Sequence, residues 1–314
     1  MFMNKKYLIL IIIIILFFGC SKKVEINYVV DNEKNFVNKL IPLFYHRNGN
    51  KMSYIENTAY GSDGYKIYSV NKNYNLLNSY KIVEGKGPGE GGYLGLFTYK
   101  DKIIWYDQGL NRFNVFNKKL EYQDLININE INLFQGFFKI NNKNYAFNIT
   151  GYDNEMRLEI VKMDFNFKKM KTDFETVNDI YIGEMGLNNY LIGKSNKYVL
   201  IYMKNSAYYF DKNDFSMVRK VKLHKENKNV FTGNMARFID IINDDIFFYF
   251  EDGYYFYDFD KDEILDVKKI TLNSNKKYKI DRFFFYFFGE KKMMYWTKER
   301  DKVIVRNVKG VEVK

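Results

Sequence analysis

Residues 103–116 of the chain read IIWYDQGLNRFNVF. Two short runs rich in β-branched and aromatic side chains, 103–106 and 112–116, flank a polar connection that contains Gly109. Such runs are typical of β-strands, because branched and aromatic side chains pack well on a pleated surface. Glycine and asparagine between the runs favour a tight reversal of the chain. We therefore predict a hairpin here, and we find the same pattern repeated along the chain.

The pattern of strand, turn and strand occurs six times, with units starting near residues 52, 103, 145, 198, 246 and 293, at spacings of 51, 42, 53, 48 and 47 residues. This is the size of a four-stranded propeller blade, which needs roughly 40–50 residues. We predict an all-β protein, a β-propeller of six blades of four antiparallel strands over residues 24–314. Val24–Val30 would complete the last blade and leave no open sheet edge. A seven- or eight-bladed ring, or a propeller with a small separate piece at 31–50, remains an alternative.

The composition supports strands throughout. Tyr 28, Phe 29 and Trp 2 bring the aromatic content to 19%, and there are only two prolines to interrupt central strands. Asp and Gly pairs such as Asp63-Gly64 supply the turns. Phe283–Phe288 is an unbroken aromatic run, which we interpret as a strand buried on both faces.

The first twenty residues predict an export signal. Lys5 and Lys6 form a short positive region, residues 7–18 are apolar, and Gly19 precedes Cys20, the one cysteine of the chain. Twelve apolar residues are too few for a helix that spans a membrane, which needs about 20. The segment resembles a bacterial lipoprotein signal, which implies cleavage after residue 19 and lipidation of Cys20. The alternative is an ordinary secretory signal with an unrelated cysteine nearby.

We accordingly divide the chain into a signal at 1–19, a tether and first strand at 20–30, and the propeller at 24–314. The resemblance implies a location in the cell envelope, with the lipid on Cys20 attached to a membrane and the ring on the periplasmic or surface side. Ser21 at the next position is compatible with the outer membrane.

The chain carries a net charge of +11, or +9 once Lys5 and Lys6 are removed. Anionic lipid headgroups or an acidic polysaccharide are accessible partners for a basic envelope protein. No stretch concentrates Lys and Arg in a recognisable nucleic-acid motif, so we expect no nucleic-acid partner. The alternative is that the lysines reflect composition alone, because Asn, Ile, Phe and Tyr are also abundant. We expect a monomer.

Gly85-Lys86-Gly87-Pro88-Gly89-Glu90 is the most recognisable motif. It resembles the GxGPGE stretch of six-bladed propellers in the NHL-repeat and TolB-like group. Residues 107–116, with Asn-Arg after a turn and Phe at the end of the run, resemble the blade pattern of the same group. The resemblance covers residues 85–116 and implies that these residues shape loops and contacts between blades, not catalysis.

Other motifs give little support for chemistry. The spacing of a dinucleotide-binding loop is present at Gly87, Gly89 and Gly92, and Asp107 follows Gly87 by twenty residues. Such a site needs a helix that begins at the glycines, and Pro88 and the residues after it do not favour one. The two histidines, His46 and His224, cannot by themselves build a typical catalytic zinc site.

A calcium loop is also unsupported. Asp258, Asp260 and Asp262 have the opening alternation, but Glu263 and Lys269 stand where a glycine and a glutamate belong, so a hairpin turn is favoured. No glycine–serine nucleophile elbow is present.

We assign no catalytic residue, no cofactor and no metal ligand. Carboxylates available for a channel site are Glu90, Asp107 and Asp240, each also explained as a turn or inter-blade residue. The expected function is a lipid-anchored binding scaffold for a protein or glycan. The alternative is a metal-dependent hydrolase or lyase with its site in the central channel.

Overall fold

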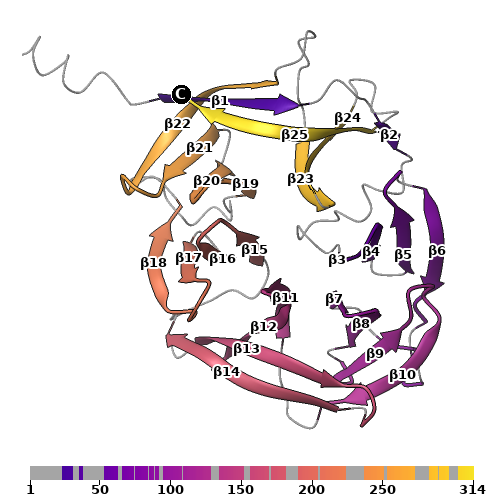
Figure 1. Cartoon of the computed structure of the whole chain (residues 1–314). Helices are drawn as coiled ribbons and strands as arrows, with labels where there is room; N and C mark the ends of the chain where they lie inside the picture. Colours follow the sequence, from indigo (N-terminus) through magenta and orange to yellow (C-terminus); the bar gives the residue numbers. More distant parts are fainter. Residues whose placement is uncertain are drawn as a thin grey trace, which may run out of the picture.

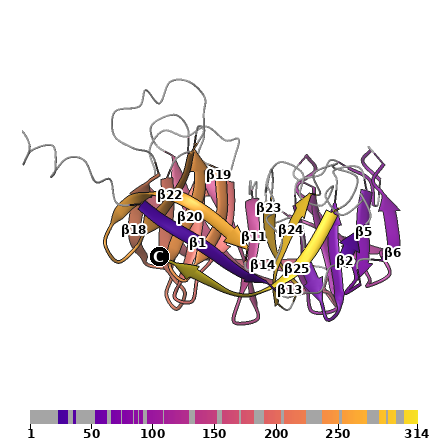
Figure 2. The same cartoon turned by 90° about the horizontal axis from the view of Figure 1, so that it is seen from above.

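The computed structural model describes residues 23–30, 35–37, 53–62, 66–73, 75–83, 85–87, 89–91, 95–107, 109–128, 134–151, 156–169, 171–181, 190–203, 206–223, 237–250, 253–272, 283–288, 290–296 and 303–314. The regular elements in these residues are 25 β-strands. Small sheets stand side by side around a central axis, so the chain forms a β-propeller (Figure 1). Seen from the side, strands run between the two faces of a disc (Figure 2). The predicted fold class is confirmed.

Four sheets contain four strands each, and consecutive strands pair antiparallel. The first sheet comprises β3 (Ser53–Ile55), β4 (Thr58–Ser62), β5 (Lys66–Asn71) and β6 (Leu76–Lys81). The second comprises β7 (Gly95–Tyr99), β8 (Lys102–Asp107), β9 (Arg112–Phe116) and β10 (Tyr122–Asn127). The third comprises β11 (Phe134–Ile140), β12 (Lys143–Thr150), β13 (Arg157–Asn166) and β14 (Lys171–Tyr181). The fourth comprises β15 (Tyr190–Lys194), β16 (Tyr198–Met203), β17 (Ser206–Asp211) and β18 (Met217–Lys222).

The fifth sheet has nine strands and closes the ring. It contains β19 (Arg237–Ile242), β20 (Asp245–Phe250), β21 (Gly253–Asp258), β22 (Glu263–Leu272), β1 (Lys23–Val30), β25 (Val303–Val313), β24 (Glu290–Trp296), β23 (Phe283–Phe288) and β2 (Asn35–Val37).

Strand β1 explains why the described residues form five sheets where we predicted six separate blades. It pairs antiparallel with β25, as expected of a strand that joins the two ends of the chain, and it also pairs parallel with β22. These two ladders merge the strand groups β19–β22 and β23–β25 into one sheet. The N-terminal strand is therefore shared between two neighbouring groups.

The structure shows which strand of each sheet the sequence pattern had detected. The unit starting near residue 52 begins on β3, the first strand of its sheet, whereas the other five starts fall on second strands. The second strands begin at residues 58, 102, 143, 198, 245 and 290. The predicted interval of 51 residues between the first two units was too long because it joined a first strand to a second strand.

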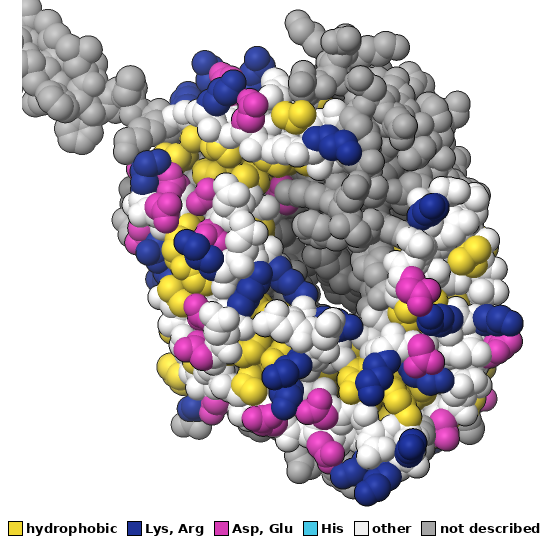
Figure 3. Space-filling view, in the orientation of Figure 1, with side chains coloured by type: hydrophobic (Ala, Val, Ile, Leu, Met, Phe, Trp, Pro, Cys, Tyr) yellow, Lys and Arg dark blue, Asp and Glu magenta, His cyan; other side chains and the backbone are white. Residues whose placement is uncertain are grey.

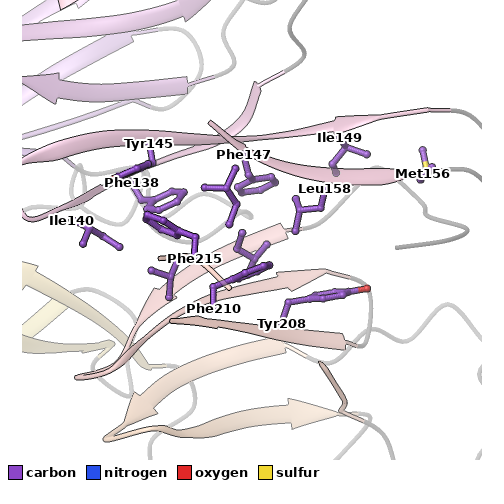
Figure 4. Packing of buried hydrophobic residues seen from close by; sticks show 13 residues of the cluster. Phe138, Ile140, Tyr145, Phe147, Ile149, Met156, Leu158, Tyr208, Phe210 and Phe215 are labelled. Carbon is purple, nitrogen blue, oxygen red and sulfur yellow. The ribbon is translucent and has the colours of Figure 1, made fainter. Parts of the chain in front are cut away.

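The hydrophobic core is divided into layers between neighbouring sheets. One layer joins the third and fourth sheets through Phe147 and Leu158 on one side and Val199 and Phe210 on the other, and all four side chains are buried. Figure 4 shows Phe147 and Leu158 facing Phe210 between the two sheets. Corresponding layers join the first sheet to the second, the second to the third, and the fourth to the fifth. Aromatic side chains fill the wedge between diverging sheets, which accounts for the aromatic composition.

Antiparallel pairing also fixes which turns share a face of the disc. Turns between the first and second strands, and between the third and fourth strands, lie on one face, which we call the hairpin face. Turns between second and third strands, and the links from one sheet to the next, lie on the opposite face. No helix in the part of the chain described here is long and apolar enough to cross a membrane.

Candidate functional site

The glycine-rich motif and the Asn-Arg motif meet at one place in the fold. The glycine-rich loop follows β6, the outermost strand of the first sheet, and leads toward β7 of the second. Arg112 is the first residue of β9, directly after the turn that follows Asp107 at the end of β8. We call this group the latch, made of the described residues of 85–91 together with Asp107, Arg112 and Asn114.

Arg112 lies at the centre of the latch. Its Nε donates to Asp107 Oδ2 at 3.3 Å, and only 6% of the Arg112 side chain and none of the Asp107 side chain is exposed. The guanidinium also donates to the backbone oxygens of Lys86 at 2.9 Å, Gly87 at 2.8 Å and Glu90 at 2.6 Å. A planar guanidinium has five donors in fixed directions, so it can bind four oxygens at once, whereas a lysine ammonium has only three donors. One side chain of the second sheet therefore holds three carbonyls of the loop that leaves the first.

The glycines of the loop leave room for two carboxylates. The Glu90 carboxylate accepts a hydrogen bond from Gly87 N at 2.8 Å, and a Cβ on Gly85 would lie 2.1 Å from Glu90 Oε2. Gly91 has φ +135°, and a Cβ there would lie 2.0 Å from Asp107 Oδ2. The motif thus has glycine where the loop backbone passes directly against Glu90 and Asp107.

Two further side chains hold Gly89, which has φ +72°. Its N–H donates to Asn114 Oδ1 at 3.2 Å, and its carbonyl accepts from the Tyr80 hydroxyl at 3.0 Å. Asn114 is fully buried, and burial raises the pKa of Tyr80. These bonds tie the loop to β6 and to β9 at once.

The latch is a structural device. Its ionic groups and loop carbonyls bond to one another, and the Asp107 and Arg112 side chains are almost inaccessible to solvent. The expectation that these residues shape a loop and a contact between blades is confirmed. The structure gives no support for a dinucleotide-binding site at these glycines. The loop leads to strand β7 instead of a helix, and Asp107 binds Arg112. Gly92 and Pro88 lie outside the described residues.

Asp240 and the aspartates of the turn after β21 also make contacts within the fold. Asp240, on β19, is buried and accepts a hydrogen bond from the Tyr28 hydroxyl at 3.1 Å. Burial, and then the charge of Asp240, raise the pKa of Tyr28.

Asp258 and Asp262 flank the β21–β22 turn, where Asp262 accepts a hydrogen bond from the Tyr257 hydroxyl at 2.6 Å. The predicted hairpin turn is confirmed, since Asp258 pairs with Glu263 across it.

Asp245 has the most perturbed carboxyl of this region. Burial, and then the nearby carboxylates Asp258, Asp260 and Asp244, raise the pKa of Asp245 to about 6 although it accepts a hydrogen bond from Phe259 N at 2.8 Å. No group of three or more His, Cys, Asp or Glu among the described residues could hold a metal ion. Cys20, His46 and His224 lie outside those residues.

Sequence reasoning missed a group of lysines beside the central axis. Lys139 on β11 and Lys194 at the end of β15 come from the first strands of neighbouring sheets, which lie nearest the axis (Figure 1). Lys212 begins the turn after β17. Dark blue side chains border the hollow in the middle of the ring in Figure 3. The available signal was a lysine at or near the end of β11 and of β15, but these two strands were not recognised from the sequence.

No family model matches the chain, and no curated protein sequence matches it. Solved structures do match. A protein of Bacteroides fragilis that carries the description of an exported protein is 11% identical, with a TM-score of 0.49 over 94% of this chain and 97% of that one. Virginiamycin B lyase from Staphylococcus aureus is 12% identical, with a TM-score of 0.43 over 91% and 99% of the two chains. A streptogramin B lyase is 9% identical, with a TM-score of 0.44 over 91% and 98%. These likenesses concern the fold alone.

Proposed function

We propose that this protein is a lipid-anchored scaffold of the cell envelope, whose propeller binds a protein or glycan through the loops of one face. The observation that carries the proposal is the latch. The motif that looks most like a chemical site is bound into the joint between the first two sheets, by Arg112 and its three carbonyl partners. A ring stiffened in this way presents many loops in fixed positions, which suits binding.

The finer parts of the proposal rest on the sequence. We propose six blades, with β23–β25 and the N-terminal strands as the sixth, in keeping with the resemblance to NHL and TolB-like propellers. We also propose that the signal at 1–19 is removed and that Cys20 carries the lipid. Only Ser21 and Lys22 separate Cys20 from β1, and two extended residues span roughly 7 Å. The lipid would therefore hold the rim of the disc close to the membrane surface.

Lipidation is tested on the full chain expressed in a bacterium that processes lipoproteins. We expect a membrane-associated protein that starts at Cys20 and carries the added mass of its acyl chains. A Cys20→Ser chain is the control and should lose that mass and the membrane association. An unmodified chain cleaved at another position, with the same fractionation as the control, would refute the anchor.

Binding is tested separately with the purified chain immobilised on a support. Solubilised envelope proteins and purified envelope polysaccharide are passed over it, and a heat-unfolded sample of the chain is the control. We expect retention of a component that the unfolded chain does not retain. Equal retention by both, or a divalent-ion-dependent hydrolysis or elimination by the purified chain, would contradict the scaffold role.

A further inference from the structure

Two lysines of the third and fourth sheets lie on the hairpin face at the inner edge of the ring, and the ammonium group of a third reaches the turn after β15 from farther out. Lys139 is the penultimate residue of β11 and Lys194 the last residue of β15. These strands are neighbours at the inner edge of the ring. Lys212 belongs to the turn that joins β17 to β18, which opens on the same face because β17 runs in the same direction as β15.

Hydrogen bonds to backbone oxygens hold two of the ammonium groups in place. Lys194 Nζ donates to the carbonyl of Lys139. Lys212 Nζ donates to the carbonyl of Ser195 and, at 3.0 Å, to that of Asn196. An ammonium group has three donors, so each keeps at least one for another acceptor. The two charges are thus positioned by the fold rather than spread over the surface.

The charge around Lys194 is unbalanced. Loss of hydration, and then the charges of Lys212 and Lys139, lower the pKa of Lys194 to about 8. The residue as a whole is exposed, although the surrounding protein removes part of the hydration of its ammonium. In the turn of Lys212, Asp211 Oδ1 accepts from Asn213 N at 2.7 Å and Asp214 Oδ1 from Ser216 N at 2.8 Å, so each carboxylate has one oxygen bound to the turn backbone. No carboxylate of the described residues forms a salt bridge with Lys194.

Like charges brought together repel, and an anion between them relieves that repulsion. We propose that Lys139, Lys194 and Lys212 form a binding site for a multiply charged phosphate or sulfate group at the mouth of the central channel. This assignment rests on the proposed binding function and names the chemistry that its ligand would carry. Free phosphates and phosphorylated or sulfated polysaccharides share this chemistry, and the test separates them.

The probe is inorganic pyrophosphate, titrated into the purified full chain by isothermal calorimetry at pH 7. We expect saturable binding that Lys194→Met and Lys139→Met each weaken at least tenfold, because methionine keeps the length of the side chain and removes the charge. Lys119→Met is the matched control. Lys119 is an exposed lysine in the turn after β9, which lies on the same face, and its loss should change the affinity less than twofold. Unchanged thermal midpoints show that the variants are folded.

A proton readout separates this site from general attraction to a basic surface. At pH 8 about half of Lys194 is neutral, so anion binding should draw protons onto Lys194, and the net proton uptake with the wild-type chain should exceed that with Lys194→Met, because protons exchanged by pyrophosphate itself contribute to both. Uptake is measured from the dependence of the binding enthalpy on the ionisation enthalpy of the buffer. No binding of pyrophosphate, or equal weakening by Lys119→Met, would overturn the site.

Polymers identify the source of the anion. If a sulfated polysaccharide binds more tightly than pyrophosphate, with the same dependence on Lys194, the ligand is a glycan. If pyrophosphate binds more tightly, the ligand is a small phosphate. Equal retention of an envelope component by the wild-type chain and by Lys194→Met would reject the anion site while leaving the scaffold role standing.

Discussion

Replacing Arg112 by methionine should open the joint between the first and second sheets. Methionine fills much of the same space, but it cannot donate to Asp107 or to the three loop carbonyls that Arg112 binds at 2.6–2.9 Å. The buried Asp107 carboxylate would then face Leu110 N, at 3.3 Å, without a cation. The change therefore leaves a desolvated charge and several unpaired acceptors.

The expected loss of stability follows from that count. Removing one partner of a buried ion pair costs about 3–5 kcal/mol, because the other charge stays buried without compensation. Each carbonyl left without a donor adds about 1 kcal/mol, and the terms do not simply add. We expect Arg112→Met to lower the free energy of unfolding by about 5 kcal/mol. Arg112→Lys keeps the charge but loses most of the hydrogen bonds, and should cost about 2–3 kcal/mol.

Urea unfolding followed by tryptophan fluorescence measures these losses, since Trp105 lies buried on β8 beside the latch. Arg157→Met is the matched control. Arg157 binds Asp179 at 2.7 Å, but 47% of its side chain is exposed, so its loss should shift the urea midpoint far less than the loss of Arg112. A loss below about 1 kcal/mol for Arg112→Met, or one equal to that of Arg157→Met, would refute the structural role of the latch.

Two further predictions concern the same fold. Gly91→Ala should destabilise the chain by about 2 kcal/mol or more, because the added Cβ would lie 2.0 Å from Asp107 Oδ2. Gly310→Ala is the control and should change the urea midpoint little, because nothing lies within 4 Å of the added Cβ. Equal effects of the two changes would contradict this prediction. Asp245 binds more protons in the folded than in the unfolded chain between pH 3.8 and about 6, so stability falls as the pH rises through that range. Asp245→Asn should raise the free energy of unfolding by about 1–2 kcal/mol at pH 7.5, after allowing for partial solvent screening, and by almost nothing at pH 4. A gain that does not depend on pH would show that the charge of Asp245 is not its cause.

The second and third strands of the sheets could be predicted from the sequence with little error. The runs 103–106 and 112–116 correspond to β8 (Lys102–Asp107) and β9 (Arg112–Phe116). These strands lie in the middle of a sheet and are buried on both sides, so most of their side chains are apolar, and the polar ones lie mainly at the strand ends. Strands at the two edges of the sheets were harder to recognise. The outer strand β14 alternates between exposed and partly buried residues and is rich in polar side chains, and the inner strand β7 begins at a glycine.

Local side-chain chemistry therefore determined that this protein folds into small aromatic-rich antiparallel sheets, because strand propensity and turn residues act between near neighbours in the chain. Contacts between distant residues were decided only in the tertiary structure. Arg112 meets carbonyls more than 20 residues away, and β1 pairs with β25 from the opposite end of the chain. The grouping of Lys139, Lys194 and Lys212 likewise depends on the rotation from one sheet to the next. That rotation arises from how whole sheets pack around the axis, and no short stretch of sequence encodes it.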